Sequence, residues 1–431
     1  MKIKRISAIQ IFDSRGYPTI ETEIELENGV CASGIVPSGA STGQYEALEL
    51  RDGDPVQWRG KSVFKAIGHV EGEISEFVCG RDIDDQQGLD EAMIALDGTD
   101  NKTRLGANAI LSVSMAAANA AAKAKGEALY TTLGSGKGTL LPLPEIQIIG
   151  GGAHANWRTD IQDFMIIAKA AKTYREALEI TFNIYHAAGD ILHEQGRRFG
   201  LADEGGYWPE LTSNEEAFEL IISAIERAGY TPGVDASLSL DIAASDLYDH
   251  STHSYCFPSE NRSFTSDEFS DLIIDWCQRY PVISIEDPAA DTDWDAWIKI
   301  KTAIGRKVQI IGDDLFTTNL GRIRKGIEKN AANAVLIKLN QIGTVSETLD
   351  AIRLTQDAGW LPVVSARSGE TEDTFIAHLA VATNAGQLKV GSFARSERMA
   401  KWNEVLRIER HLGDRSQFKG AEIYQTIHSE K

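Results

Sequence analysis

The chain has 431 residues, of which 42% are hydrophobic and 25% are charged, and its formal net charge is −20. This length allows two or more domains, the composition is that of an ordinary globular protein, and the negative charge argues against nucleic acid or an acidic membrane as a general partner. An anionic ligand would therefore need a locally positive pocket built from Lys, Arg or metal ions.

The cysteines and the first residues bear on where the protein works. Four cysteines without CxxC spacing occur in the chain, namely Cys31, Cys79, Cys256 and Cys277. This usage favours reduced thiols in a cytoplasmic protein over a disulfide framework or a zinc site. The first residues are charged and interrupted by Asp13 and Gly16, so no signal peptide is expected. The apolar residues 107–122 include Asn108 and Ser112 and predict a buried core helix, so no membrane association is expected.

The first 130 residues carry an antiparallel pattern. Residues 19–26 alternate strictly between Ile, Thr or Leu on one face and Glu on the other. Asn28-Gly29 then turns the chain into residues 30–36, which is typical of a β-hairpin. Helical patterns follow to about Lys125. Residues 1–133 therefore predict an α+β domain in which a meander packs on helices.

A Gly- and Pro-rich stretch at residues 134–145 marks a boundary. In this stretch Lys137 is followed by Gly138 and fits no phosphate-binding loop, so we interpret the stretch as a linker. Beyond it, residues 143–431 alternate between strand and helix patterns. The expected helices cover residues 173–196, 267–278, 294–304, 347–358 and 372–384. Such alternation is typical of an α/β fold with parallel strands and helices packed outside them.

Five apolar runs in the second half of the chain end on a charged residue. These residues are Asp241, Glu286, Asp313, Lys338 and Lys389. The successive gaps from Glu286 onward are 27, 25 and 51 residues, which match one or two units of strand, loop, helix and loop. In a barrel of such units the carboxyl ends of the strands face the active site. We therefore expect these five side chains to converge.

Asp241, Glu286 and Asp313 form the first candidate group. Buried carboxylates are costly unless they are paired or bound to a metal, and three hard oxygen donors suit Mg²⁺. Each residue alone also fits a helix N-cap or a loop carboxylate. Three of them at successive strand ends favour a metal site.

Lys338 and Lys389 form the second candidate group. Burial and neighbouring positive charge both lower the pKa of a lysine, so an amine beside a metal is expected to accept a proton. The alternative is that the aliphatic stems extend to the surface at strand ends, and this interpretation competes chiefly at Lys389.

Four further motifs place polar groups on loops. They are SGASTG at residues 38–43, GGGAH ending at His154, DEGG containing Glu204, and the pair Arg367-Ser368. The first suits a lid over phosphate or metal, and Arg367 suits a phosphate clamp. Each motif alone is also common in ordinary loops.

Together these motifs resemble the enolase family over essentially the whole chain. The resemblance is carried by DSRGYPT from Asp13, SGASTG, LGANAIL from Leu105, DEGG, SIED, GDDLF, IKLNQIGT and RSGETEDT. It implies an N-terminal α+β domain that caps a modified (β/α)8 barrel of the TIM type. It also implies a homodimer that acts on a small, anionic, phosphorylated substrate.

The resemblance further implies a metal and a proton-transfer pair. The residues that match ligands of the catalytic Mg²⁺ in this family are Asp241, Glu286 and Asp313. Ser41 matches a lid residue that joins a second Mg²⁺. Lys338 matches the base that removes a proton next to the substrate carboxylate, and Glu204 matches the acid that helps the hydroxyl leave.

Substrate contacts follow from the same resemblance. Arg367 and Ser368 match phosphate contacts, and Lys389 matches a contact to the substrate carboxylate. His154 matches a loop residue near the substrate. Asp163 stands where the family has a loop glutamate, one methylene longer.

Other positions also depart from the family pattern. Ala366 stands in Ser365-Ala366-Arg367-Ser368 where enolases have S-H-R-S, so an active-site imidazole is missing. Further replacements near the leaving group and the lid are Ala202, Trp208, Val390 and residues 156–158. The metal and base residues all match.

Three functions are compatible with this sequence. The first is an Mg²⁺-dependent lyase of glycolysis that dehydrates 2-phosphoglycerate to phosphoenolpyruvate. The second is a paralogue that applies the same enolate chemistry to another phosphorylated or phosphonate substrate, as the enolase-like carboxyphosphonoenolpyruvate synthases do. The third is a non-catalytic scaffold, which would not need a buried lysine beside three carboxylates.

Overall fold

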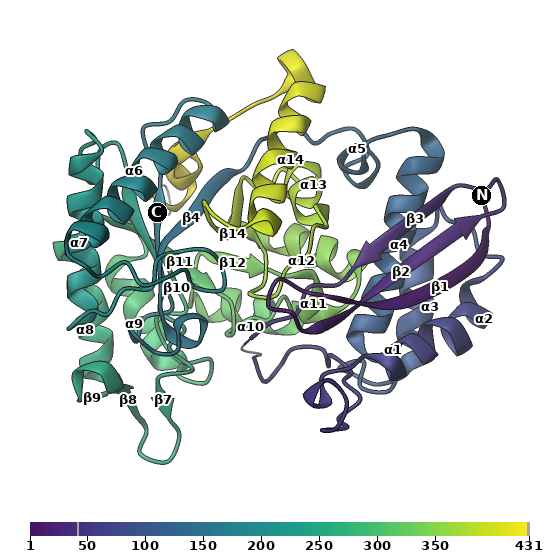
Figure 1. Cartoon of the computed structure of the whole chain (residues 1–431), viewed down its shortest axis with the longest axis horizontal. Helices are drawn as coiled ribbons and strands as arrows, with labels where there is room; N and C mark the ends of the chain where they lie inside the picture. The colour runs from purple at the N-terminus through teal and green to yellow at the C-terminus, as the bar shows by residue number, and fades with distance from the viewer. Residues whose placement is uncertain (41–42, 429–431) are drawn as a thin grey trace.

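The computed structural model describes residues 1–40 and 43–428, and it places an N-terminal sheet with its helices beside a closed barrel (Figure 1). The N-terminal strands pair antiparallel in the order β1 (Ile3–Phe12), β2 (Pro18–Leu26) and β3 (Cys31–Ile35). The helical segments that follow are η1 (Trp58–Gly60), α1 (Phe64–His69), η2 (Val70–Ile74), α2 (Ser75–Val78), α3 (Gln86–Asp97), α4 (Ala107–Lys125) and α5 (Leu129–Leu133).

The predicted hairpin and the predicted core helix are both confirmed. Strand β2 joins β3 through Asn28-Gly29, and Ile20 and Ile24 are fully buried. Helix α4 packs across β2 and β3. A Cβ atom at Gly34 would lie 2.5 Å from the backbone nitrogen of Ala116, so this close approach of helix to strand requires glycine.

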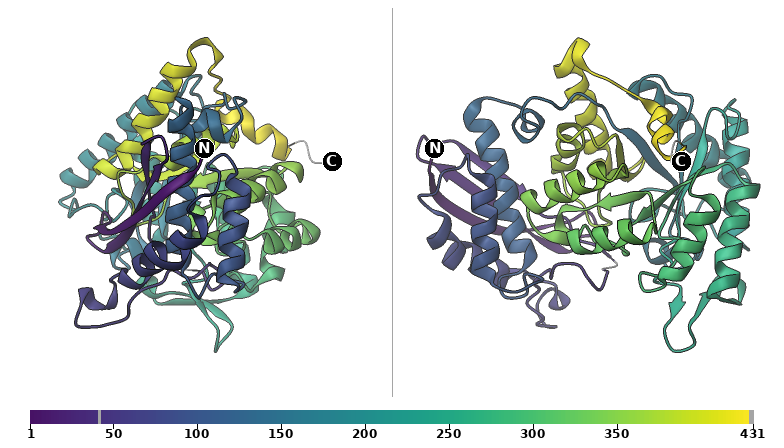
Figure 2. Two further views of the ribbon diagram at one scale, coloured as in Figure 1. Left: turned by 90° about the vertical axis from the view of Figure 1, so that its right-hand side faces the viewer. Right: turned by 180° about the vertical axis from the view of Figure 1, so that it is seen from behind.

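The remainder of the chain forms an eight-stranded closed barrel covered by helices (Figures 1 and 2). Around the barrel the strands are β4 (Leu143–Gly150), β5 (Asp163–Ile167), β6 (Ser237–Asp241), β10 (Val282–Glu286), β11 (Gln309–Gly312), β12 (Ala334–Ile337), β13 (Leu361–Ser365) and β14 (Gln387–Ser392). The barrel helices are α6 (Tyr174–Glu194), α7 (Asn214–Arg227), α8 (Ser266–Arg279), α9 (Trp294–Ile304), α10 (Leu320–Lys329), α11 (Leu339–Ile342), α12 (Val345–Asp357), α13 (Phe375–Ala382) and α14 (Ser396–Leu412).

The direction of β5 differs from the expectation of parallel strands. It runs antiparallel to both β4 and β6, whereas the other barrel pairs are parallel. A parallel neighbour requires a crossover, usually through a helix packed outside the sheet. Residues 151–162, which join β4 to β5, contain only the short 3₁₀ turn η3 (Gly152–Ala155) and return the chain directly.

Two small additions complete the fold. A three-stranded sheet of β7 (Tyr248–Asp249), β8 (Ser254–Phe257) and β9 (Arg262–Thr265), with η4 (Pro258–Glu260), is inserted between β6 and α8. The last described segments are η5 (Gly413–Arg415), η6 (Gly420–Tyr424) and α15 (Gln425–His428).

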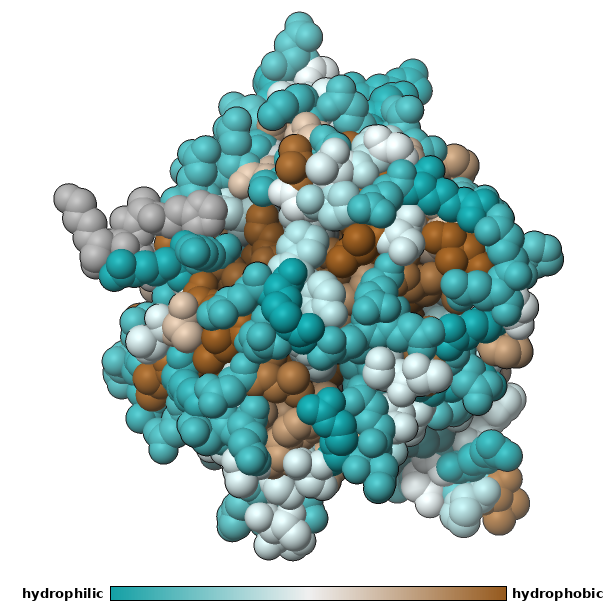
Figure 3. Space-filling model, turned by 90° about the vertical axis from the view of Figure 1, so that its left-hand side faces the viewer, coloured by the Kyte–Doolittle hydropathy of each residue, from teal (hydrophilic) through white to brown (hydrophobic). Residues whose placement is uncertain are grey.

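The face of the molecule drawn in Figure 3 is mainly polar. Hydrophilic side chains dominate this face, and the hydrophobic ones lie in patches between them (Figure 3). Among the described helices, none has the length and apolar character needed to cross a membrane.

Candidate active site

Four of the five charged residues lie at the carboxyl ends of barrel strands. Asp241 and Glu286 are the last residues of the neighbouring strands β6 and β10, and they face each other in register. Asp313 directly follows β11, and Lys338 directly follows β12. The fifth residue, Lys389, lies inside β14 rather than at its end. The barrel thus brings all five to one end.

Lys389 is the centre of a buried ion cluster. Its Nζ atom lies 2.8 Å from Oδ2 of Asp241, 2.7 Å from Oε2 of Glu286 and 3.4 Å from Oδ2 of Asp163. The alternative, that its stem extends to the surface, is therefore wrong. Burial acts to lower the pKa of Lys389, but Asp241, Glu286 and Asp163 outweigh it and raise this pKa well above the ordinary value.

Lys338 pairs with Asp313. Its Nζ atom lies 2.5 Å from Oδ2 of Asp313, and both side chains are largely buried. Burial acts to lower the pKa of Lys338, but the carboxylate of Asp313 overcomes burial and raises it. The expected lowering of this pKa is therefore wrong for the protein side chains alone, because Asp313 together with Glu286 outweighs burial and the neighbouring cations.

The acidic side chains gather in two tight groups within the described residues. Each residue contributes one ligand atom, and these atoms lie within 4.8 Å of one another. The groups are His154 with Asp163 and Glu204, and Asp287 with Asp313 and Asp314. The predicted ligand trio of Asp241, Glu286 and Asp313 is not one of them. Lys389 lies against the first two and Lys338 against the third.

Glu286 pairs with Lys389 through one carboxylate oxygen only. Its Oε1 atom is buried and makes no hydrogen bond to any described residue. Burial, followed by the charge of Asp241, raises the pKa of Glu286 well above its ordinary value. A buried carboxylate of this kind is stabilised by an additional cation.

His154, Asp163 and Glu204 form a second wall of the site. Asp163 is the first residue of β5 rather than a loop residue, and it pairs in register with Asp241. Nδ1 of His154 lies 3.7 Å from Oδ1 of Asp163. Burial acts to lower the pKa of His154, but Asp163 and Glu204 together raise it. This corner favours a protonated imidazole.

Arg367 and Ser368 follow β13 and contact N-terminal residues. Arg367 makes two contacts to the carboxylate of Glu46, from Nη1 to Oε2 at 3.0 Å and from Nη2 to Oε1 at 3.2 Å. The hydroxyl of Ser368 accepts a hydrogen bond of 2.7 Å from the backbone nitrogen of Ala40 and one of 3.3 Å from Arg15. Ser41, the predicted second-metal residue, lies outside the described residues.

Three amide side chains that the sequence did not single out orient the acids. Gln162 donates to Asp241 over 2.9 Å, and Gln341 donates to Asp313 over 2.7 Å. Gln147 donates to Asp163. Amides carry no charge and match no strand-end pattern, so the sequence pattern did not indicate these residues. Their buried positions in the structure show their role.

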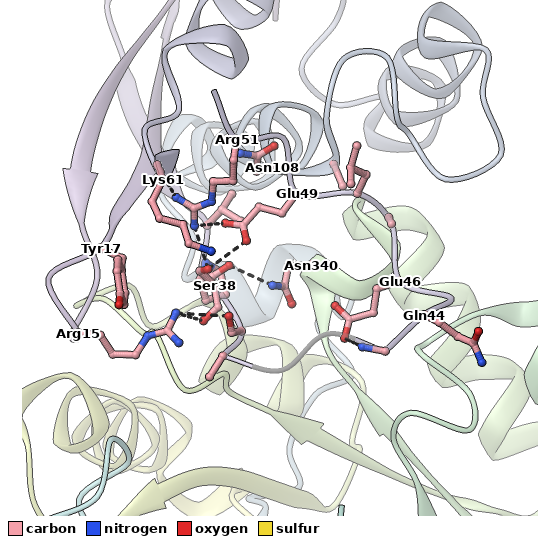
Figure 4. A pocket seen from close by; sticks show the side chains of 18 of the residues that line it. Arg15, Tyr17, Ser38, Gln44, Glu46, Glu49, Arg51, Lys61, Asn108 and Asn340 are labelled. Atoms are coloured by element: carbon pink, nitrogen blue, oxygen red, sulfur yellow. Dashed lines mark hydrogen bonds and ion pairs between the residues drawn. The ribbon is translucent and has the colours of Figure 1, made fainter. Parts of the chain in front are cut away.

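The small cavity between these residues has a volume of about 30 Å³, and Ala366 lies in its wall. A wider cavity of about 660 Å³ adjoins it, mainly between N-terminal segments (Figure 4). Gly39, Ala40 and Glu46 line both cavities. These three residues therefore lie between the wider cavity and the charged site.

The loop after His154 is also remodelled. The guanidinium of Arg158 lies 5.3 Å from the ring centre of Phe199 and 5.1 Å from that of Trp208. A Cβ atom at Gly200 would lie 2.3 Å from Nε1 of Trp208, so Trp208 packs directly on this glycine. Two of the replacements, Arg158 and Trp208, therefore contact each other.

This fold and site define a TIM-type barrel protein with buried carboxylates and lysines at the carboxyl ends of its strands. Residues 3–133 match the family model described as "Enolase, N-terminal domain", and residues 138–427 match "Enolase, C-terminal TIM barrel domain". Over 424 residues the chain is 52% identical to Enolase 1 of Desulfitobacterium hafniense (strain Y51), which covers 98% of this chain and 97% of that protein. The chain belongs to the enolase family.

Proposed function

We propose that this protein is an Mg²⁺-dependent hydro-lyase that dehydrates 2-phosphoglycerate to phosphoenolpyruvate in glycolysis. The observation that carries the proposal is the buried cluster in which Lys338 and Lys389 lie among Asp241, Glu286 and Asp313 at one end of the barrel. A surface or scaffold role gives no reason to bury five charges together.

The residues present fit a divalent cation. Asp241, Glu286 and Asp313 offer carboxylate oxygens, the donors that Mg²⁺ prefers. Oε1 of Glu286 is buried without a partner among the described residues. When bound, Mg²⁺ supplies positive charge that stabilises the negative charge developing on the substrate carboxylate. It would also offset the charge of Asp313, which raises the pKa of Lys338.

Each side chain of the site is assigned a separate role in the reaction. We assign Lys338 as the base that takes the proton next to the substrate carboxylate, and Glu204 as the acid that protonates the leaving hydroxyl. Lys389 contacts the substrate carboxylate, and Arg367 and Ser368 hold the phosphate. His154 and Asp163 line the side of the leaving group, and Ser41 would help to hold a second Mg²⁺.

A direct assay tests this function. Purified protein with 2-phosphoglycerate and Mg²⁺ should produce phosphoenolpyruvate, followed by its ultraviolet absorbance. We expect Lys338→Ala to lower kcat by about 10³-fold and to stop exchange of the α-proton with solvent deuterium. Glu204→Gln should keep that exchange and lose dehydration. Lys172→Ala, which removes an exposed lysine elsewhere, serves as the control.

A second candidate function keeps the chemistry and changes the substrate. It is favoured by Ala366 in the wall of the site cavity and by the contact of Arg158 with Trp208. Absence of turnover with 2-phosphoglycerate, together with intact α-proton exchange, would support it. Absence of both, with Mg²⁺ bound, would support a scaffold.

We further propose a cytoplasmic homodimer in which residues 1–133 form a capping domain on the barrel of residues 143–431. All four cysteines are free thiols, which supports a reducing compartment.

The N-terminal part exposes Ile9 by 57% and Phe12 by 48%, which supports an apolar contact with a second copy. Sedimentation velocity should give a dimer, and Phe12→Glu should shift it toward monomer.

A further inference from the structure

Glu46 is a buried acid that the N-terminal part of the chain contributes to the barrel site. Its side chain is 7% exposed, and its partner Arg367 is 4% exposed. The two Glu46 oxygens accept from both terminal nitrogens of Arg367, at 3.0 Å and 3.2 Å. Such two-point pairing fixes the plane of a guanidinium as well as its charge.

The same carboxylate reaches the metal side of the site. Oε1 of Glu46 also accepts from the Gln341 amide at 3.4 Å. That amide donates to Oδ1 of Asp313 at 2.7 Å, and its oxygen accepts from Thr318 at 2.8 Å. The Thr318 hydroxyl in turn accepts from the backbone nitrogen of Lys338 at 3.0 Å. Glu46 therefore contacts one substrate-binding residue directly and one candidate metal ligand through a single amide.

The backbone around Glu46 is fixed from both sides. The next residue, Ala47, donates its backbone N–H to the carbonyl of Gln341 at 2.8 Å. Leu48 donates its backbone N–H to the carbonyl of Asn101, and its own carbonyl accepts from the backbone N–H of Ala107. These bonds hold the backbone next to Glu46 and thereby position its carboxylate. In Figure 4, Glu46 and Asn340 are labelled among the residues around the wider cavity, which adjoins the site.

We propose that Glu46 is a positioning residue of the active site, whose carboxylate holds the Arg367 guanidinium and the Gln341 amide in the orientation that phosphate and metal binding require. This inference rests on the proposed function for the identity of the substrate. It names the N-terminal part of the chain as a contributor to phosphate recognition.

The alternative is that Glu46 only joins two parts of the chain. A joining role predicts lower stability without a selective change in substrate affinity. A positioning role predicts a change in KM, because a neutral amide cannot hold both guanidinium nitrogens. Competition between Glu46 and phosphate for Arg367 predicts the reverse, a lower KM in the variant.

Glu46→Gln tests the proposal. We expect KM for 2-phosphoglycerate to rise about tenfold or more while kcat stays within about threefold. Glu46→Asp, which keeps the charge on a shorter side chain, should lie between Gln and the native residue, and it replaces Glu46→Gln if that variant fails to fold. Unchanged or lowered KM in a folded variant would overturn the proposal.

Glu49→Gln is the matched control, because the Glu49 carboxylate pairs with Arg51 at 2.6 Å and accepts from the Ser38 hydroxyl at 3.0 Å in the same segment, and its effect on Arg367 is an electrostatic attraction. Its KM should remain within about twofold of native.

Binding of inorganic phosphate separates this proposal from the proposed function. Calorimetry with phosphate and Mg²⁺ should show binding to native protein and to Glu49→Gln, and at least about tenfold weaker binding to Glu46→Gln. This result would stand even if 2-phosphoglycerate is not turned over. Equal phosphate binding by native protein and Glu46→Gln, or no binding by native protein, would overturn the inference.

Discussion

Glu145 is a buried carboxylic acid that the proposed chemistry does not use. It lies on β4 opposite Lys389 in register and is fully buried. Its Oε2 atom accepts from Ser239 at 3.0 Å, while Oε1 has no partner among the described residues. Burial raises the pKa of Glu145 to about 7, against the opposing effects of Lys389 and Ser239. The protein therefore holds this group at a cost whenever it is ionised.

The sign of this pKa shift predicts a pH-dependent stability. A carboxyl group whose pKa is raised on folding destabilises the native state as pH rises from the unfolded value, near 4.5, through about 7. Glu145→Gln should remove that cost. In metal-free protein we expect the variant to gain about 2–3 kcal/mol relative to native protein between about pH 5 and about pH 8.5.

Urea unfolding at the two pH values measures this gain. Glu27→Gln, which changes an exposed carboxylate, should show the same stability difference from native at both. A Glu145→Gln difference that does not depend on pH would contradict the raised pKa.

Ala366 makes a second prediction at the scale of one residue. It is buried, with an exposed fraction of 5%, and borders a cavity of only about 30 Å³. An imidazole placed here would need more room, so Ala366→His should overpack the site. We expect a loss of about 1–3 kcal/mol in unfolding free energy and no gain in kcat. An increase in kcat without loss of stability would show that the missing imidazole limits the rate.

Helix α8 shows how local sequence determines an element. Its N-cap residue Thr265 accepts from the backbone of Glu268 at 3.3 Å, and Glu268 accepts from the backbone of Thr265 at 2.8 Å. Thr265→Ala should therefore cost about 1 kcal/mol of stability and leave kcat unchanged.

Thermal unfolding checks this value against Thr302→Ala inside α9. Among the described residues, the Thr302 hydroxyl donates to Ile298 in its own helix, and alanine favours helix, so this control should be neutral or slightly stabilising. Equal destabilisation by both substitutions would argue against a specific cap.

Elements with a strong local pattern were predictable from the sequence. The hairpin at Asn28-Gly29 and helix α9 at Trp294–Ile304 are confirmed. Helix α13 begins at Phe375 rather than near residue 372, because the Asp373 carboxylate accepts from the Phe375 backbone nitrogen. The direction of β5 could not be predicted, since a short apolar run carries no information about which way a strand points.

The site was predictable where charge meets a strand end. Asp241 and Glu286 follow that rule, because an apolar strand leaves a charge at its end conspicuous. This rule does not find Glu46, because Glu46 lies in a segment without regular structure. Its partner Arg367 is more than 300 residues away in the chain. The same holds for Gln341, whose role depends on tertiary contacts alone.

At the scale of the whole molecule, a buried ion pair ties the N-terminal part to the barrel. Nζ of Lys102 lies 2.9 Å from Oε2 of Glu347 at the start of α12, and the lysine side chain is 3% exposed. Glu347 also accepts from Thr344, the N-cap of the same helix, at 2.7 Å. Since Gln can keep the Thr344 bond, Glu347→Gln removes the charge and leaves this contact to the helix in place.

Loss of that charge should destabilise both parts together. A buried ammonium left without its carboxylate is costly, and with Glu347 about a quarter exposed we expect a loss of about 2 kcal/mol. The double substitution Lys102→Met with Glu347→Leu should recover most of it, because an apolar pair of similar size needs no compensation. Calorimetry should show one transition that moves as a whole. If only a fraction of the unfolding enthalpy moved, the N-terminal part and the barrel would fold independently, and the contact of Glu46 with Arg367 would be lost before the barrel unfolds.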